Sequence, residues 1–399
     1  MSTLPLLSEP ATTALVLTLG ALNLLIGLYS VGSAFRYRRY ARKAAPASKG
    51  IATTGRLPSV TLFVPCCGEE EGLEENLESL LVQDYPEFRA RFIVESSADG
   101  AVPVIERLLE RHSGRGGLVI AGAARGRSQK VHNLLAAIQD APESEVLVFA
   151  DSDGRPEPGW LKLLVPALDR AKVGVASTYR FYLPEPATFA TLLRSVWNAS
   201  VLTLLGDHHH NFAWGGSMAM RRDVFERIGV VDVWQNALSD DYAVTHAVRR
   251  AGLKVEFVPQ CLVATGGRVG FIDLLSWSAR QIAITRVYWP ALFRVAAVTH
   301  LLFTTFLVLA PLAGFFRLWT AILVLAFWSG VVRAGAIADL APQWRRGIQR
   351  HFWAYSLMVP LAAFLTMQGV LRALSSRRVE WRGKIYEMRS ASETVILRS

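Results

Sequence analysis

Two carboxylates one residue apart, Asp151 and Asp153, stand directly after the apolar run 146–150. The composition of this run is typical of a fully buried strand. Ligands of open α/β sheets bind at the carboxyl ends of the strands, and two acids placed there can share Mg²⁺ or Mn²⁺ that bridges to substrate phosphates. A solvated turn after a strand is the alternative interpretation.

The elements that must position these acids alternate along the chain. The apolar pattern predicts strands and amphipathic helices in turn, at 60–65, 71–82, 92–94, 102–112, 118–121, 130–139, 146–150 and 160–168. This alternation predicts an α/β fold with a mostly parallel sheet and helices on both faces.

Polar clusters follow each of these strands and should surround one crevice. They lie at 66–71, 95–99, 126–133 and 151–153. Lys130 and Asn133 at a helix start, beside paired acids, suit a nucleotide with phosphates, because an amino group and a helix N-terminus both favour anions. Four ordinary polar loops are the alternative.

The alternation loosens after residue 170. We expect a strand at 173–179, a helix at 189–205 and a glycine-interrupted strand at 212–220, then a helix from Ser239 to Arg250. Asp240 and Asp241 in its first turn could simply stabilise the helix dipole. The histidines 208–210 predict an acceptor-side or interfacial loop, since three consecutive side chains cannot all face one metal ion.

Composition and charge favour a membrane protein. The chain has 399 residues, 51% of them hydrophobic, and a net charge of +10. Much of the positive charge flanks apolar segments, at 36–43, 344–351 and 375–378, which is the positive-inside pattern and argues against a nucleic-acid partner. Apolar stretches of about bilayer length lie at 11–35, 293–316, 318–338 and 352–374, and an amphipathic interfacial segment lies at 271–289.

The cysteine pattern indicates a reducing compartment. Only Cys66, Cys67 and Cys261 occur, with no C-x-x-C spacing, and we treat the first two as packing residues and not as nucleophiles. Together with the positive-inside pattern, this predicts a multi-pass integral membrane protein with its catalytic domain in the cytosol.

Several motifs resemble a known family. They are the 76–86 segment that ends Asp84-Tyr85-Pro86, Lys130-Val-His-Asn133-Leu, Asp151-Ser-Asp153, Trp214-Gly215-Gly216-Ser217 with 220–224, and Asp240-Asp241-Tyr242. With these motifs the chain resembles membrane-anchored family 2-type glycosyltransferases of the GT-A fold. It resembles especially the ceramide glucosyltransferase family and bacterial hopanoid-associated relatives, from the N-terminal anchor to Tyr386. The resemblance to the bacterial relatives implies a location in a bacterial inner membrane.

The resemblance implies roles for individual residues. Asp241 would be the general base, and Asp153 with Asp151 would hold Mg²⁺ or Mn²⁺ on the leaving diphosphate. Donor-binding residues would be Glu95, Asp99, Lys130, Asn133, Asp151, Arg280, Gln281 and Arg286. Acceptor-side residues would be Trp214, Gly215, Gly216, Ser217, Asp240 and Trp289.

Two departures from the family pattern leave roles open. The loop after the second strand contains Glu95 and Asp99, either of which could replace the usual nucleotide-binding aspartate. The interfacial motif reads Arg280-Gln281-Ile-Ala-Ile without the usual Arg-Trp, while Arg286 and Trp289 lie further on. These arginines could clamp a diphosphate or reach towards lipid headgroups.

The implied function is inverting, divalent-cation-dependent transfer of a sugar from a nucleotide sugar, expected to be a UDP-sugar, to a ceramide-, sphingolipid- or hopanoid-like lipid. A processive polysaccharide synthase and a non-catalytic membrane scaffold are the alternatives. The expected domains are an anchor with its basic flank at 1–43, a GT-A domain at 56–265, an interfacial segment at 266–291, about three C-terminal transmembrane or interfacial helices at 292–376, and a basic tail at 377–399.

Overall fold

A computed structural model describes residues 9–44, 56–139, 141 and 144–398. The chain forms two compact units. The sheet unit comprises residues 43–191, 204–268 and 377–399, and the helical unit comprises residues 1–42, 192–203 and 269–376. Each unit is described by itself below.

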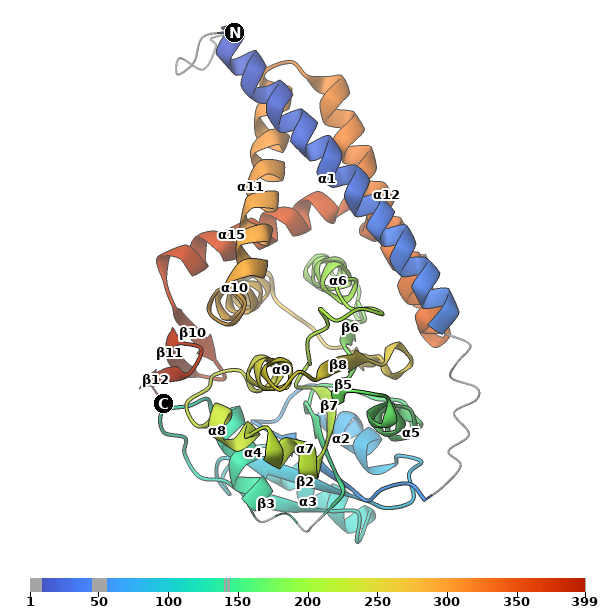
Figure 1. Ribbon diagram of the computed structural model, residues 1–399, viewed down its shortest axis with the longest axis vertical. Coiled ribbons are helices and arrows are strands. Elements are labelled where there is room, and N and C mark those ends of the chain that lie inside the picture. Colours follow the sequence, from blue (N-terminus) through green and yellow to red (C-terminus); the bar gives the residue numbers. More distant parts are fainter. Residues whose placement is uncertain (1–8, 45–55, 140, 142–143, 399) are drawn as a thin grey trace. The chain divides into compact units, whose positions relative to one another are not determined.

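The sheet unit is built on seven strands in the order β3-β2-β1-β4-β7-β5-β8. Figure 1 labels β2, β3, β5, β7 and β8 among them. The strands are β1 (Val60–Pro65), β2 (Phe88–Val94), β3 (Gly116–Ile120), β4 (Val146–Ala150), β5 (Val173–Ser177), β7 (Ser217–Arg221) and β8 (Lys254–Phe257). Only β7 runs antiparallel to its neighbours, β4 and β5. The predicted mostly parallel α/β sheet is confirmed.

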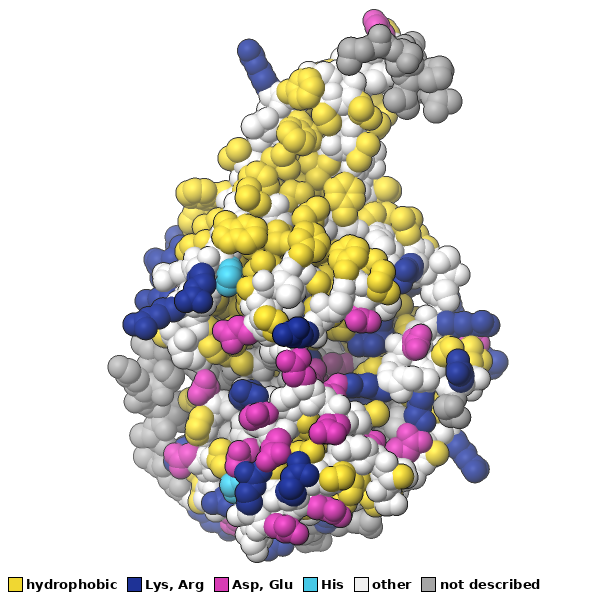
Figure 2. Space-filling view, turned by 180° about the vertical axis from the view of Figure 1, so that it is seen from behind, with side chains coloured by type: hydrophobic (Ala, Val, Ile, Leu, Met, Phe, Trp, Pro, Cys, Tyr) yellow, Lys and Arg dark blue, Asp and Glu magenta, His cyan; other side chains and the backbone are white. Residues whose placement is uncertain are grey.

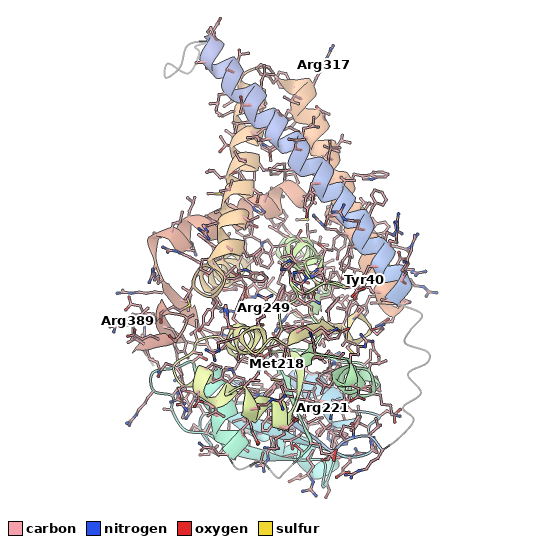
Figure 3. All side chains as sticks on the ribbon, in the orientation of Figure 1. Tyr40, Met218, Arg221, Arg249, Arg317 and Arg389 are labelled. Carbon is pink, nitrogen blue, oxygen red and sulfur yellow. The ribbon has the colours of Figure 1, made fainter. Side chains whose placement is uncertain are left out.

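Helices cover both faces of this sheet because successive side chains of the central strands alternate between two hydrophobic clusters. Leu62 packs with α2 (Leu73–Leu81), α3 (Val102–Arg111) and α5 (Trp160–Leu164). Phe63 and Met218 (labelled in Figure 3) pack with α4 (Gln129–Gln139), α8 (Val230–Trp234) and α9 (Asp240–Arg250). The short helix α7 (Arg222–Arg227) contributes Val224 and Phe225 to the second cluster.

Two smaller sheets complete this unit. Strand β6 (Arg180–Tyr182) pairs with β9 (Val263–Thr265). Strands β10 (Arg378–Trp381), β11 (Lys384–Ser390) and β12 (Glu393–Arg398) form an antiparallel sheet. The interpretation of 377–399 as a basic tail was therefore wrong. Its charged residues alternate with the buried side chains of Val379, Tyr386 and Met388, which is the pattern of a half-buried strand pair.

The helical unit contains α1 (Glu9–Ala44), most of α6 (Phe189–Leu202), α10 (Phe271–Tyr288), α11 (Pro290–Leu312), α12 (Phe316–Leu340), α13 (Arg345–Arg350), α14 (Phe352–Leu357) and α15 (Val359–Ser375). Within the described residues, α1, α11 and α12 are long and apolar enough to cross a membrane. Exposed hydrophobic side chains such as Leu25, Val295 and Leu312 cover these helices (Figure 2). The predicted crossing at 352–374 is divided between α14 and α15, and the 17-residue α15 is too short to meet the same criterion.

Side-chain contacts hold the ends of the long helices together. Asp339 near the end of α12 accepts from Arg38 at 2.9 Å and from Arg42 at 3.0 Å, and both arginines belong to the predicted basic flank of the anchor. A hydrophobic cluster of Val16, Leu19 and Phe306 joins α1 to α11.

Candidate active site

The paired acids after β4 bind one arginine that the sequence interpretation missed. The Arg180 guanidinium, on β6, lies 2.5 Å from Asp151 Oδ2 and 2.7 Å from Asp153 Oδ2. Its carbon lies 4.7 Å from the centre of the Trp214 ring, within the range of a cation–π contact. The strand predicted at 173–179 ends directly before Arg180, so the strand-end rule that selected Asp151 could have found it.

A buried lysine joins Asp151 to a second acid. Lys130 Nζ in α4 lies 2.8 Å from Asp151 Oδ1 and 3.1 Å from Asp240 Oδ2 in α9. The three side chains are 13%, 19% and 4% exposed. Burial at this level disfavours the charged form of each group. The positive charge of Lys130 and the negative charges of the two acids therefore stabilise one another.

The protonation of this triad follows from burial and charge. Burial alone would lower the pKa of Lys130, but Asp151 and Asp240 outweigh it, and the pKa is raised. Burial would raise the pKa of Asp151, yet Lys130 and Arg180 hold it below its ordinary value. For Asp240, burial outweighs Lys130 and raises the pKa to about 6. Asp151 is therefore a carboxylate at neutral pH, whereas Asp240 changes its protonation state about one pH unit below neutrality.

Asp241 is oriented by three donors. Its Oδ2 accepts from Gly215 N at 3.2 Å, and its Oδ1 accepts from Tyr242 N at 2.7 Å and from the Ser239 hydroxyl. Ser239 is the N-cap of α9, and its hydroxyl also accepts from Tyr242 N. The start of the helix thus holds one carboxylate in a fixed orientation beside the Trp214–Ser217 segment.

The two glycines of that segment allow its backbone to approach the acids. A Cβ on Gly215 would lie 2.1 Å from Asp240 Oδ2, and a Cβ on Gly216 would lie 2.1 Å from the Trp214 ring and 2.5 Å from Asp151 Oδ2. Any larger residue would therefore displace the acids. Ser217 itself is buried, and its hydroxyl accepts from the Trp160 indole at 2.8 Å.

The residues predicted to bind the donor brace the loops of the crevice. Asp99 Oδ1 accepts from Gly68 N at 2.8 Å and from Ala101 N at 2.9 Å, which ties the loop after β2 to the loop after β1. Glu95 Oε1 lies 2.9 Å from Lys384 Nζ. Asn133 is buried, and its Nδ2 donates to the carbonyl of Ile93 in β2 at 3.3 Å. Direct donor contact by these residues stays a prediction.

Four predicted residues belong to the helical unit. Arg280, Gln281 and Arg286 lie on α10, and Trp289 follows its end. Arg286 donates to the carbonyl of Ala373 in α15, so it braces two helices. Whether these side chains bind the donor or acceptor also stays a prediction.

Asp151 and Asp153 differ in how well they suit a metal ion. Among the described residues, no group of three or more His, Cys, Asp or Glu side chains could hold a metal ion. Asp153 Oδ1, however, is buried without a hydrogen-bond partner, which suits a ligand to a cation whose other ligands come from a bound substrate. Both oxygens of Asp151 already face cationic side chains. Asp153 thus suits the predicted role of metal ligand as it stands. Asp151 suits that role only if the metal ion takes the place of Lys130 or Arg180 at one of its oxygens.

The cysteines near the crevice are not activated. Burial and the charge of Asp99 raise the pKa of both Cys66 and Cys67, so both thiols stay protonated at neutral pH. This agrees with the expectation that neither cysteine is a nucleophile. Cys66 is buried, as expected for a packing residue, whereas Cys67 is exposed, so the interpretation of Cys67 as a packing residue was wrong.

Comparisons with known proteins were made for the whole chain. Two curated relatives from Caenorhabditis elegans are similar to it. Ceramide glucosyltransferase 1 is 22% identical over 60% of this chain, and ceramide glucosyltransferase 3 is 20% identical over 62%. The matched region spans about half (52%) of the length of each relative.

Two solved structures also align with the chain. The mannosyltransferase PcManGT from Pyrobaculum calidifontis, in complex with GDP-Man and Mn²⁺, aligns with 90% of this chain and 98% of its own, at 19% identity and a TM-score of 0.47. GalNAc-T7 with UDP, GalNAc and Mn²⁺ aligns with 60% of this chain and 50% of its own, at 11% identity and a TM-score of 0.42.

The family comparison covers almost the whole chain. The model of glycosyl transferase family 21 matches residues 21–394, which include the acids after β4, the Trp214–Ser217 segment, the start of α9 and the C-terminal sheet. The chain therefore belongs to glycosyl transferase family 21.

Proposed function

We propose that this chain transfers a sugar from a nucleotide-sugar donor to the hydroxyl of a membrane lipid. The observation that carries the proposal is the Asp241 carboxylate, oriented by Gly215, Ser239 and Tyr242 beside a buried cluster of acids and cations. A reaction that removes a proton from one substrate and releases a diphosphate from the other needs this combination.

In this proposal Asp241 accepts the proton of the lipid hydroxyl. The hydroxyl oxygen then forms a bond to the anomeric carbon of the sugar, on the face opposite the diphosphate. The bond between that carbon and the diphosphate breaks, and its electron pair leaves with the nucleoside diphosphate. One displacement of this kind inverts the anomeric configuration and needs no covalent enzyme intermediate.

The neighbouring residues have different tasks. Asp240 faces Lys130 at 3.1 Å, so it positions the lysine and leaves proton removal to Asp241. Lys130 and Arg180 supply positive charge towards the leaving diphosphate. Asp153, with Asp151, would hold Mg²⁺ or Mn²⁺, which when bound neutralises charge that develops on the diphosphate.

The lipid acceptor is inferred from the rest of the chain. Within the described residues, three helices have the length and apolarity of membrane spans, and a soluble sugar acceptor would not require them. The named relatives act on ceramide, so a ceramide-, sphingolipid- or hopanoid-like lipid is the acceptor class we propose, with a UDP-sugar as donor. The basic ends of the helices support a cytosolic sheet unit.

The test uses the full chain in lipid nanodiscs, supplied with Mn²⁺, a panel of UDP- and GDP-sugars, and a bacterial or sphingolipid extract. Mass spectrometry of the lipids should show one added hexose or amino-sugar. Asp241→Asn should lower the rate by about 10²–10⁴-fold, while the exposed Asp223→Asn should not.

Other outcomes separate the alternatives. Equal rates for Asp241→Asn and wild type would disprove the base assignment. A product that grows by many sugars would identify a processive synthase. Absence of transfer from every donor would support a non-catalytic scaffold.

A further inference from the structure

We propose that the hairpin of β10 and β11 is a wall of the donor site and that Arg382, in its turn, binds the diphosphate of the nucleotide sugar. The inference rests on the proposed function, which it extends to a segment first interpreted as a basic tail.

Three side chains of the hairpin reach three different loops of the crevice. Arg382 forms an ion pair with Glu70 in the loop after β1. Lys384 Nζ lies 2.9 Å from Glu95 Oε1 in the loop after β2. The Tyr386 hydroxyl accepts from Gln129 N, at the start of α4, at 3.3 Å.

These contacts place the hairpin at the carboxyl edge of the sheet. The three loops follow neighbouring strands or precede the helix that carries Lys130, and ligands of open α/β sheets bind at this edge. Strands β10 and β11 therefore lie at the same edge of the sheet as the acids after β4, some 230 residues earlier in the sequence.

The side chains of the hairpin differ in how far they are exposed to solvent. Tyr386 is 2% exposed, and the Lys384 side chain is 13% exposed. The Arg382 side chain is 41% exposed. Tyr386 and Lys384 fix the hairpin on the loops, while the guanidinium remains accessible to a ligand.

Arg382 has more positive charge available for a diphosphate than Lys130 or Arg180. Lys130 and Arg180 each face two carboxylates, so their charge is largely neutralised within the protein. Within the part of the chain that the structure describes, Arg382 has one ion-pair partner, Glu70. A guanidinium presents five donors in a planar fork, so several remain for a diphosphate.

The backbone at this turn is unusual for an arginine. Arg382 has φ +54° and Gly383 has φ +76°, so both lie in the left-handed region. Asparagine tolerates this region at least as well as arginine. Arg382→Asn therefore removes the guanidinium without disturbing the turn.

The experiment measures binding of UDP, GDP and uridine to the full chain in nanodiscs by calorimetry. Arg382→Asn should weaken UDP binding about tenfold, the loss expected for one charge-assisted contact, and leave uridine binding within about twofold. The control is Arg389→Asn, in the same sheet, where Arg389 pairs with Glu393 and is exposed (Figure 3). It should bind as wild type does.

A second variant tests the idea without changing the hairpin. Glu70→Gln removes the anion that competes for Arg382 and should tighten UDP binding a few-fold. Unchanged UDP binding in both variants would overturn the inference, as would an equal loss for uridine and UDP in Arg382→Asn, since that would indicate a displaced wall. If wild type binds neither UDP nor GDP, the proposed function itself fails.

Discussion

Lys130→Met should destabilise the sheet unit strongly, because it leaves two buried acids without their shared cation. With an effective dielectric constant of about 20, ion pairs at 2.8 and 3.1 Å attract by roughly 6 and 5 kcal/mol. Desolvation of the buried groups offsets much of this attraction, and breaking a buried pair typically costs about 3–5 kcal/mol. At roughly 2–4 °C per kcal/mol, the melting temperature should fall by about 6–20 °C.

A matched control separates burial from ion pairing. Lys162 Nζ lies 2.7 Å from Asp84, but the two side chains are 44% and 70% exposed. Lys162→Met should therefore cost less than about 1 kcal/mol. Thermal unfolding of both variants, followed by circular dichroism in the same detergent, makes the comparison.

The pH dependence of Lys130→Met has a defined sign. Without the lysine, the pKa of Asp240, already above that of the unfolded chain, should rise further, and the pKa of Asp151 should rise from its lowered value to above that of the unfolded chain. The folded state then binds protons more tightly than the unfolded state, so the variant regains stability as the pH falls from 8 to 5. Equal losses in Lys130→Met and Lys162→Met, or a loss that grows at low pH, would refute this reasoning.

Three further predictions concern other parts of the site. Because burial raises the pKa of Asp240 to about 6, its contribution to stability is present below about pH 4 and is lost as the pH rises through 6. The stability of wild type relative to Asp240→Asn should fall by about 2 kcal/mol between pH 4 and 7 in denaturant titrations. Asp153→Ala should weaken Mn²⁺ binding in the presence of UDP at least about tenfold in electron paramagnetic resonance titrations, and unchanged binding would exclude Asp153 as a ligand. Gly216→Ala should cost about 1–3 kcal/mol because its Cβ meets the Trp214 ring, whereas Gly117→Ala, with open space around its Cβ, should not.

Local sequence patterns were sufficient to predict most elements of the sheet unit. The apolar runs at β1 and β4 and the amphipathic pattern of α2 and α4 depend only on neighbouring residues. The same patterns placed Asp151 at the end of a strand and Asp241 in the first turn of a helix. The long apolar helices followed from their composition alone.

The pairing of the site residues was decided by the tertiary structure. Strand β7 inserts antiparallel between β4 and β5, which brings the Gly215–Gly216 backbone against Asp151 and Asp240. Arg180 reaches Asp151 and Asp153 because β6 pairs with β9 outside the main sheet. No local periodicity specifies such strand order, because it depends on which buried surfaces fit together.

The C-terminal sheet illustrates the same limit. Read locally, residues 377–399 are basic and polar, and their alternation is too short to distinguish a strand from a tail. Only in the folded unit do Val379, Tyr386 and Met388 find a surface to bury against. The sequence by itself determined which residues were able to carry charge and chemistry. The tertiary structure decided which of them meet, because contacts between distant segments are set by the packing of the whole unit.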